Sequence, residues 1–188
     1  MRLEICNLRL VEAVRAGVLS GGLSGVGDAV AGDADMDVPC GDCTACCTSS
    51  QFIHLAPDDV AARAAIPAQL LVAAPGLPPG HVVMGFDERG HCPMLDEGTC
   101  SIYDARPRTC RTYDCRVFAA AGVTPEGQPE IAAKVGDWHF DDDDGLLDRI
   151  RASVDPDVPR PLDRALRAVG PVAVELARRR LGGPEPRR

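Results

Sequence analysis

Apolar and polar residues alternate along this chain in short segments, a pattern that predicts a mixture of brief strands and helices. In residues 1–19, apolar side chains that include Val14 and Val18 recur near helical spacing, which predicts an amphipathic helix. The glycines of residues 20–35 lack the spacing of a phosphate-binding loop and are typical of a flexible linker. We therefore expect residues 1–35 to form a flexible N-terminal extension.

The middle of the chain alternates apolar runs with turn residues, which predicts strands joined by short helices. Residues 51–57 predict a strand, and helix-favouring runs follow at 60–65 and 68–73. Residues 81–86 and 91–95 flank a turn-forming segment, so we expect them to pair as a β-hairpin.

The C-terminal third has a mainly helical pattern. Residues 131–135 predict a short strand, and apolar residues in 146–154 then recur at helical spacing. A last helix over residues 162–181 is expected to be interrupted around Gly170 and Pro171, because proline disrupts a helix interior.

The cysteines carry the strongest chemical signal, because eight of the nine fall into two groups of four. Two residues between cysteines close a tight loop that directs both sulfurs at one ion. Three thiolates at this spacing also hold three corners of a [4Fe–4S] cluster in bacterial ferredoxins, and soft thiolates select zinc or iron–sulfur over harder cations. The candidate metal ligands are Cys40, Cys43, Cys46 and Cys47 in the first group, and Cys92, Cys100, Cys110 and Cys115 in the second.

The adjacent pair Cys46 and Cys47 constrains how these thiols are used. Neighbouring side chains diverge by about 100° on a helix and point to opposite faces on a strand, so two neighbours rarely bind one small ion. The pair therefore predicts either two metal sites or one polynuclear centre. Cys6 stands apart from both groups and is interpreted as a small buried apolar residue.

Other candidate ligands are weaker. The acidic run of residues 141–144 lacks the pattern of a calcium loop and is interpreted as a helix N-terminus. No serine-hydrolase, zinc-protease or phosphate-loop motif is present in the sequence. The histidines are also secondary to the cysteines as ligands: His54, His81, His91 and His139.

Composition limits the surroundings in which the protein works. The net charge of -8 argues against nucleic-acid binding, and no run approaches the roughly 18 apolar residues of a membrane span. We expect a cytoplasmic protein, where thiols stay reduced, with an unidentified protein partner or substrate. Aromatic residues make up only 4% of the chain, so a core short of large side chains would gain from a metal cross-link.

The cysteine blocks resemble a known family. CGDCTACC, then GHCPML, TCSIYDARPRTCR and a final cysteine, resemble the YkgJ-type CxxCxxCC cysteine-cluster proteins over about residues 38–118. The resemblance implies a zinc- or iron-chelating domain that uses all eight clustered cysteines. The flagellin lysine N-methylase is similar in its cysteine block, which implies an iron–sulfur centre and methyl transfer.

The charged residues of the second block suggest a supporting role. Arg106 and Pro107 are expected to begin a short helix that carries Cys110. Arg106 and Arg111 could offset the negative charge of thiolates through hydrogen bonds to sulfur. The alternative is that Asp104 and Arg106 cap or salt-bridge the helix start.

We therefore predict a small α+β fold: a metal-stabilised cysteine-cluster domain over residues 36–140, with short strands and a hairpin, followed by a helical region over 141–188. The predicted function is chelation of iron, as an iron–sulfur cluster, or of zinc, through the eight cysteines, and ferredoxin-like spacing favours iron. The alternatives are a cluster-dependent protein-modifying enzyme similar to the lysine N-methylase and a purely structural zinc module. The sequence leaves open whether the protein is an enzyme.

Overall fold

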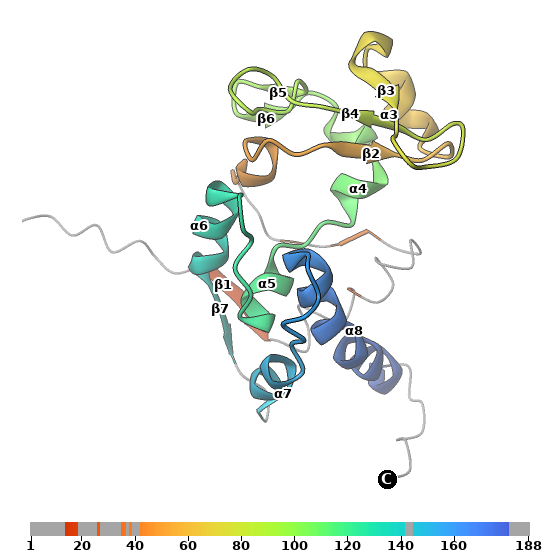
Figure 1. The fold of residues 1–188 in the computed structure, drawn as a ribbon. Coiled ribbons are helices and arrows are strands. Elements are labelled where there is room, and N and C mark those ends of the chain that lie inside the picture. Colours follow the sequence, from red (N-terminus) through yellow and green to blue (C-terminus); the bar gives the residue numbers. More distant parts are fainter. Residues whose placement is uncertain are drawn as a thin grey trace, which may run out of the picture.

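The structure is a computed structural model that describes residues 14–18, 26, 35–36, 38, 42–141 and 145–180 (Figure 1). Side chains are described for residues 26, 35–36, 38, 42–140 and 145–174. Short sheets and helices are mixed along the described chain, so the fold is α+β, as predicted. The predicted boundaries at residues 35/36 and 140/141 stay predictions.

A three-stranded antiparallel sheet forms one half of the molecule. Its strand order is β2 (Ile53–Leu55), β4 (Val82–Met84) and β3 (Leu71–Ala73), and helix α3 (Val60–Ala65) connects β2 towards β3. A single 3-10 turn, η2 (Ala68–Leu70), precedes β3. The strand predicted over 51–57 and the helix over 60–65 are confirmed, whereas the second helical run at 68–73 is half strand.

One face of this sheet is buried. The strand register aligns Ile53 with Met84 and Met84 with Leu71, and Ile53 and Met84 are buried together with Leu55. We call the buried residues of this half the sheet-side core; they are Ile53, Leu55, Ala62, Ile66, Met84 and Met94.

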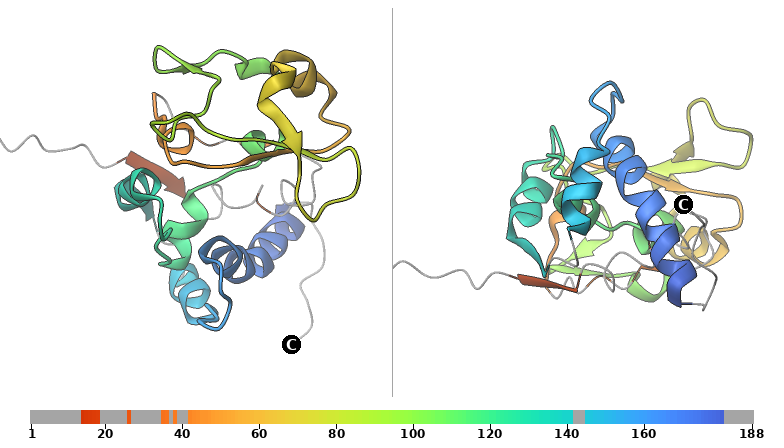
Figure 2. Two further views of the ribbon diagram at one scale, coloured as in Figure 1. Left: turned by 45° about the horizontal axis from the view of Figure 1, so that its top comes forward. Right: turned by 90° about the horizontal axis from the view of Figure 1, so that it is seen from below.

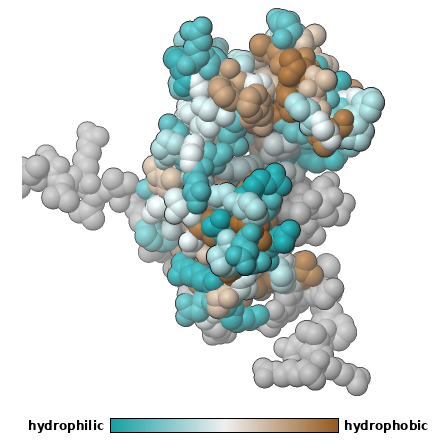
Figure 3. Space-filling view, viewed as in Figure 1, coloured by the Kyte–Doolittle hydropathy of each residue, from teal (hydrophilic) through white to brown (hydrophobic). Residues whose placement is uncertain are grey.

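The opposite face and the edges of this half expose apolar side chains. Phe52 is 67% exposed and lies against Phe86, with 5.2 Å between ring centroids. Val60 and Val72 are also exposed, and Figure 3 shows apolar surface gathered over α3 and β3.

The hairpin predicted between residues 81–86 and 91–95 is wrong. Strand β4 pairs with β2 and β3, and residues 95–96 (β5, Leu95–Asp96) pair instead with β6 (Thr99–Cys100). The turn itself forms, since the Asp87 carboxylate accepts the His91 backbone N–H at 2.8 Å. Strand β4, however, has β2 and β3 on its two sides, and sequence alternation alone could not identify these more distant partners.

Four helices form the other half: α5 (Arg116–Ala121), α6 (Pro129–Asp137), α7 (Leu146–Ala152) and α8 (Pro161–Arg180). We call their buried interior the helix-side core. Figure 2 shows these helices grouped below the sheet half. The buried residues of the helix-side core are Val26, Cys115, Val117, Phe118, Ala120, Ala121, Val123, Ile131, Trp138, Leu146, Ile150, Ala165, Ala168, Val169, Val172 and Ala173.

Two predictions for the helical half need correction. Residues 131–135 lie in α6 and not in a strand, because Pro129 suits a first helical turn and Ile131 alone among residues 129–137 is fully buried. Helix α8 runs through Pro171 without a break. Apolar side chains on both sides of that proline, including Val169 and Val172, pack into the helix-side core and hold the helix together.

A short parallel pair joins the N-terminal part of the chain to the helical half. Strand β1 (Val14–Val18) pairs with β7 (Trp138–Asp141), and Val14 lies opposite Trp138. The helix predicted over residues 1–19 is therefore wrong at 14–18, where β-branched valines and an available partner strand favour extended backbone. The rest of that predicted helix, and residues 142–144 of the acidic run, lie outside the described residues.

No helix in the described ranges is long and apolar enough to cross a membrane.

Candidate metal centre

Seven of the eight clustered cysteines lie in the described part of the chain, and Cys40 lies outside it. No disulfide joins any two of these seven. They sit on three separate segments: a 3-10 turn η1 (Ala45–Cys47), the region around the β5–β6 pair, and the short helix α4 (Arg108–Arg111) with the residues that follow it.

Backbone hydrogen bonds bring four of the thiol-bearing residues together on the sheet side. The Cys92 N–H donates to the carbonyl oxygen of Cys47 at 2.7 Å, which ties the first cysteine block to the second. The Leu95 N–H then donates to the Cys92 carbonyl at 2.9 Å, and Leu95 pairs with Cys100 across the β5–β6 hairpin.

Helix α4 supplies the fourth member of this set. Pro107 is buried immediately before the helix, and its carbonyl accepts the Cys110 N–H at 2.9 Å. Cys110, Cys92 and Cys100 are all partly buried against the sheet-side core. The short helix predicted to begin at Arg106-Pro107 is confirmed.

Burial and the charges of neighbouring thiols raise the pKa values of the cysteines in this group. Burial is the largest cause that raises the pKa of Cys47 to about 11, and the charges of Cys92, Cys100 and Cys43 raise it further. Burial also raises the pKa of Cys110 to about 12, with added repulsion from Cys92, Cys47 and Cys100. Burial raises the pKa of Cys92 as well, and Cys100 contributes to that shift. We call Cys47, Cys92, Cys100 and Cys110 the sheet-side thiols.

Such a group is unfavourable as four thiolates unless positive charge lies among them. The guanidinium of Arg106 acts in that direction, since its charge lowers the pKa values of Cys47 and Cys110. A soft metal ion would act far more strongly, because coordination deprotonates a thiol outright. The chemistry of these donors therefore fits a zinc or iron centre.

In this structure the sulfurs stand apart. Within the described ranges, no three Cys, His, Asp or Glu side chains are arranged to hold a metal ion together. Four sulfurs around one zinc ion would each lie at about 2.3 Å from it, which requires the side chains to turn inwards. Backbone hydrogen bonds and packing against the sheet-side core place the four residues in one region of the sheet half.

The two remaining described cysteines of the doublet and of the second block differ in burial: Cys46 is exposed, whereas Cys115 is buried. Cys115 precedes α5, is 6% exposed and belongs to the helix-side core. The indole Nε1–H of Trp138 donates to Cys115 Sγ at 3.1 Å. Burial raises the pKa of the Tyr113 hydroxyl, and the charges of Cys46 and Cys115 raise it further.

The other residues that the sequence analysis singled out, Cys43, Arg106 and Arg111, each make different contacts. Cys43 is half-buried and adds to the charge near Cys47. Arg106 stacks on the Tyr103 ring, with its guanidinium carbon 3.6 Å from the ring centroid. Arg111 pairs with Asp35 and donates to the Arg106 carbonyl, so its contacts are those of a structural residue.

The histidines form no group with the sheet-side thiols. His54 and His81 contact each other, with 2.9 Å between Nε2 of the first and Nδ1 of the second. His91 is half-buried, and His139 is exposed. Sequence spacing did not predict the His54–His81 contact, because the two residues are 27 positions apart.

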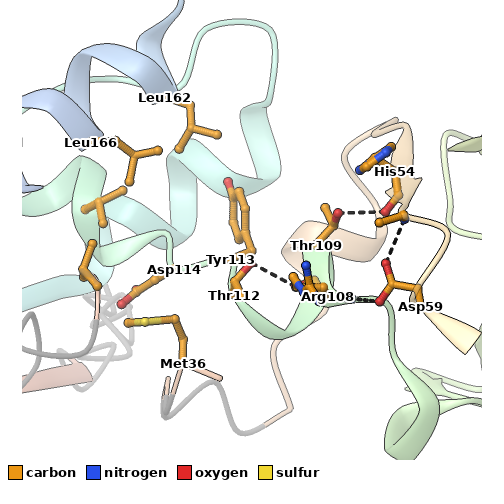
Figure 4. Close-up of a pocket in the computed structure, with 13 residues that line it drawn as sticks. Met36, His54, Asp59, Arg108, Thr109, Thr112, Tyr113, Asp114, Leu162 and Leu166 are labelled. Atoms are coloured by element: carbon orange, nitrogen blue, oxygen red, sulfur yellow. Dashed lines mark hydrogen bonds between the residues drawn. The ribbon is translucent and has the colours of Figure 1, made fainter. Parts of the chain in front are cut away.

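Asp59 is the supporting residue that the sequence analysis missed. Its carboxylate is buried, at 7% exposure, and accepts the Ala56 N–H at 2.9 Å and the Arg108 N–H at 2.8 Å (Figure 4). Through these two bonds it fixes the first turn of α4, and hence Cys110, to the end of β2. The neighbouring Asp58 forms an exposed ion pair with the Arg108 side chain, whose hydrogen bond lowers the pKa of Asp58.

A pocket of about 290 Å³ lies between the two halves. Figure 4 shows His54, Asp59 and Arg108 on its sheet side and Leu162 and Leu166 on its helix side. Tyr113 lies between them, and its hydroxyl is buried without a hydrogen bond of ordinary geometry in the described part of the chain.

Comparison with known proteins finds a family model that matches part of the chain. Residues 39–122 match the family model named CxxCxxCC, which is described as a putative zinc- or iron-chelating domain. The family resemblance drawn from the cysteine blocks is thereby confirmed over this segment. No curated protein and no solved structure matches the chain at a significant level.

Proposed function

We propose that the protein binds a transition metal through the four sheet-side thiols. The observation that carries this proposal is that the Cys92 N–H donates to the Cys47 carbonyl at 2.7 Å, while Cys92, Cys100 and Cys110 pack against the same sheet-side core. Four soft donors from three chain segments suit either a tetrahedral Zn²⁺ or a [4Fe–4S] cluster. Either group would cross-link the segments that carry these cysteines.

Zinc is the simpler occupant, and an iron–sulfur cluster is the second candidate. Ferredoxin-like spacing within the first cysteine block favours a cluster held by several of its thiols. The sheet-side thiols, however, combine one cysteine of that block, Cys47, with three cysteines of the second block. Four thiolate ligands are typical of structural zinc.

Metal and acid-labile sulfide content, with a visible spectrum, tests the proposal on protein purified without oxygen. Zinc without colour supports the four-thiolate zinc centre. Iron with sulfide and a visible band that bleaches on reduction supports the cluster instead. A protein that contains neither metal, and takes up none when reduced and supplied with it, would contradict metal binding.

A matched pair of variants assigns the metal to these thiols. Cys110→Ser should lose most of the metal, because it removes one of four ligands from the set. Cys6→Ser serves as the control, since the sequence places Cys6 outside both cysteine groups. Equal metal loss in the two variants would count against the assignment.

A further inference from the structure

Strand β3 lies at an open edge of the three-stranded sheet. The strand order β2-β4-β3 gives it one neighbouring strand, β4, among the described residues. The Ala74 N–H donates to the His81 carbonyl at 3.0 Å, in line with the register that pairs Ala73 with Val82. Backbone groups of an antiparallel strand bond to one partner at every second residue. The backbone groups of Val72 therefore face β4, and those of Ala73 face the open edge.

The open edge of β3 is self-complementary. By the same alternation, the backbone groups of Leu71 also face this edge. The Leu71 N–H is used within the chain, since it donates to the Ala68 carbonyl. The edge therefore offers one acceptor, the Leu71 carbonyl, and one donor, the Ala73 N–H. A second copy related by a two-fold axis offers the same two groups in the reverse order.

The surface around this edge is uncharged and largely apolar. Residues 64–80 contain no Asp, Glu, Lys or Arg, although charged residues make up 26% of the chain. Val72 and Leu77 are 57% and 48% exposed, and Figure 3 shows apolar surface gathered over α3 and β3. Proteins often protect an edge strand with charged side chains, and β3 has none.

Charge favours a second copy of this chain at this edge. Two copies that each have a net charge of -8 repel each other. The repulsion is smallest where the copies meet through an uncharged surface, because the charged groups then lie furthest apart. The segment 64–80 is such a surface on both copies.

We propose that two copies of this chain pair through β3, antiparallel and about a two-fold axis at Val72. Each Ala73 N–H then donates to the Leu71 carbonyl of the other copy, and the two sheets join into one. The two Val72 side chains lie opposite each other at the axis, in a closely spaced pair without hydrogen bonds of its own. Because β3 is short, the interface is small and the dimer is weak.

Sedimentation velocity on the reduced, metal-loaded full chain tests this pairing in a concentration series up to about 1 mM. The reductant excludes dimers linked by disulfides. A dimer that forms with rising concentration is expected. Val72→Lys places two like charges opposite each other at the axis and should weaken the dimer by about tenfold or more. Val174→Lys is the control, because Val174 is 42% exposed on α8, and it should leave the dimer unchanged.

Ala73→Pro distinguishes strand pairing from simple apolar contact. It removes the N–H that faces the open edge and keeps the bonds of Val72 to β4, and proline is tolerated on edge strands. The variant should lose the dimer while its circular dichroism stays that of the wild type. A wild type that stays monomeric throughout the series would overturn the proposal. A dimer that persists in Val72→Lys, or in folded Ala73→Pro, would also overturn it. If Ala73→Pro does not fold, Val72→Lys decides the question, because Val72 is exposed.

Discussion

The helix-side core and the sheet-side core differ in the number of apolar side chains that they bury and in the cysteines that pack beside them. The helix-side core buries sixteen of the described residues, among them Phe118, Ile131, Trp138 and Ile150. The sheet-side core buries six, and partly buried cysteines pack around them. Each fully buried large apolar side chain contributes about 1.5–3 kcal/mol, so the apolar contribution to stability is much smaller on the sheet side.

This difference suggests what the thiols do for the fold. The strands of the sheet half have only two or three residues each, and two-stranded pieces of that length are marginal on their own. A metal held by Cys47, Cys92, Cys100 and Cys110 would cross-link the segments on which these residues lie. The two halves should therefore respond differently to loss of metal and to loss of apolar packing.

Metal removal should have the largest effect, and it should be confined mainly to the sheet half. A structural zinc contributes about 10–16 kcal/mol in zinc-finger peptides, and part of such a contribution would be lost here. Amide hydrogen exchange after treatment with a chelator should show lost protection in β2, β3 and β4. Amides of α5, α7 and α8 should stay protected. Equal protection of the sheet half before and after chelation would contradict the comparison.

Truncation of a side chain in the helix-side core should lower the stability of the protein by an amount that does not depend on metal. Phe118→Ala removes a side chain that is 2% exposed and should cost about 3–5 kcal/mol, measured by denaturant unfolding. The cost should be the same with and without metal, because Phe118 lies in the other core. Phe52→Ala is the control: Phe52 is 67% exposed, and the loss of its ring contact should cost about 1 kcal/mol or less. A Phe118→Ala cost that depends on metal would show that the two halves are coupled.

The smallest of these effects should come from the bond that ties α4 to the sheet. Asp59→Asn replaces one of two accepting oxygens by an N–H₂ group and should cost about 1–3 kcal/mol, since one backbone N–H loses its acceptor. It should also weaken metal binding, measured by competition with a chelator, because α4 carries Cys110. Asp58→Asn is a matched control, since its ion pair with Arg108 is exposed and should change neither quantity appreciably. Equal stability and equal metal affinity of the two variants would contradict the supporting role of Asp59.

Local sequence signals predicted the elements whose contacts are close in the chain. Proline followed by acidic residues marked the start of the helix at Val60, and Arg106-Pro107 marked the helix that carries Cys110. The failures have long-range causes. Residues 14–18 form a strand because a partner lies at Trp138, and Pro171 is accommodated because α8 packs into a large core.

The candidate site shows the same limit. Cysteine spacing predicted the family model that residues 39–122 match, and the adjacent pair Cys46–Cys47 indicated two sites or one polynuclear centre. It could not predict Asp59, whose partner Arg108 is 49 residues away, or Trp138, which is 23 residues from Cys115.

The most direct test of the central claim is X-ray absorption at the edge of the native metal. Coordination by the four sheet-side thiols predicts a shell of about four sulfurs, at about 2.3 Å if the metal is zinc. In Cys110→Ser this shell should lose a sulfur or the metal should be lost, whereas Cys6→Ser should give the wild-type spectrum. A shell made mainly of nitrogen and oxygen would contradict the account.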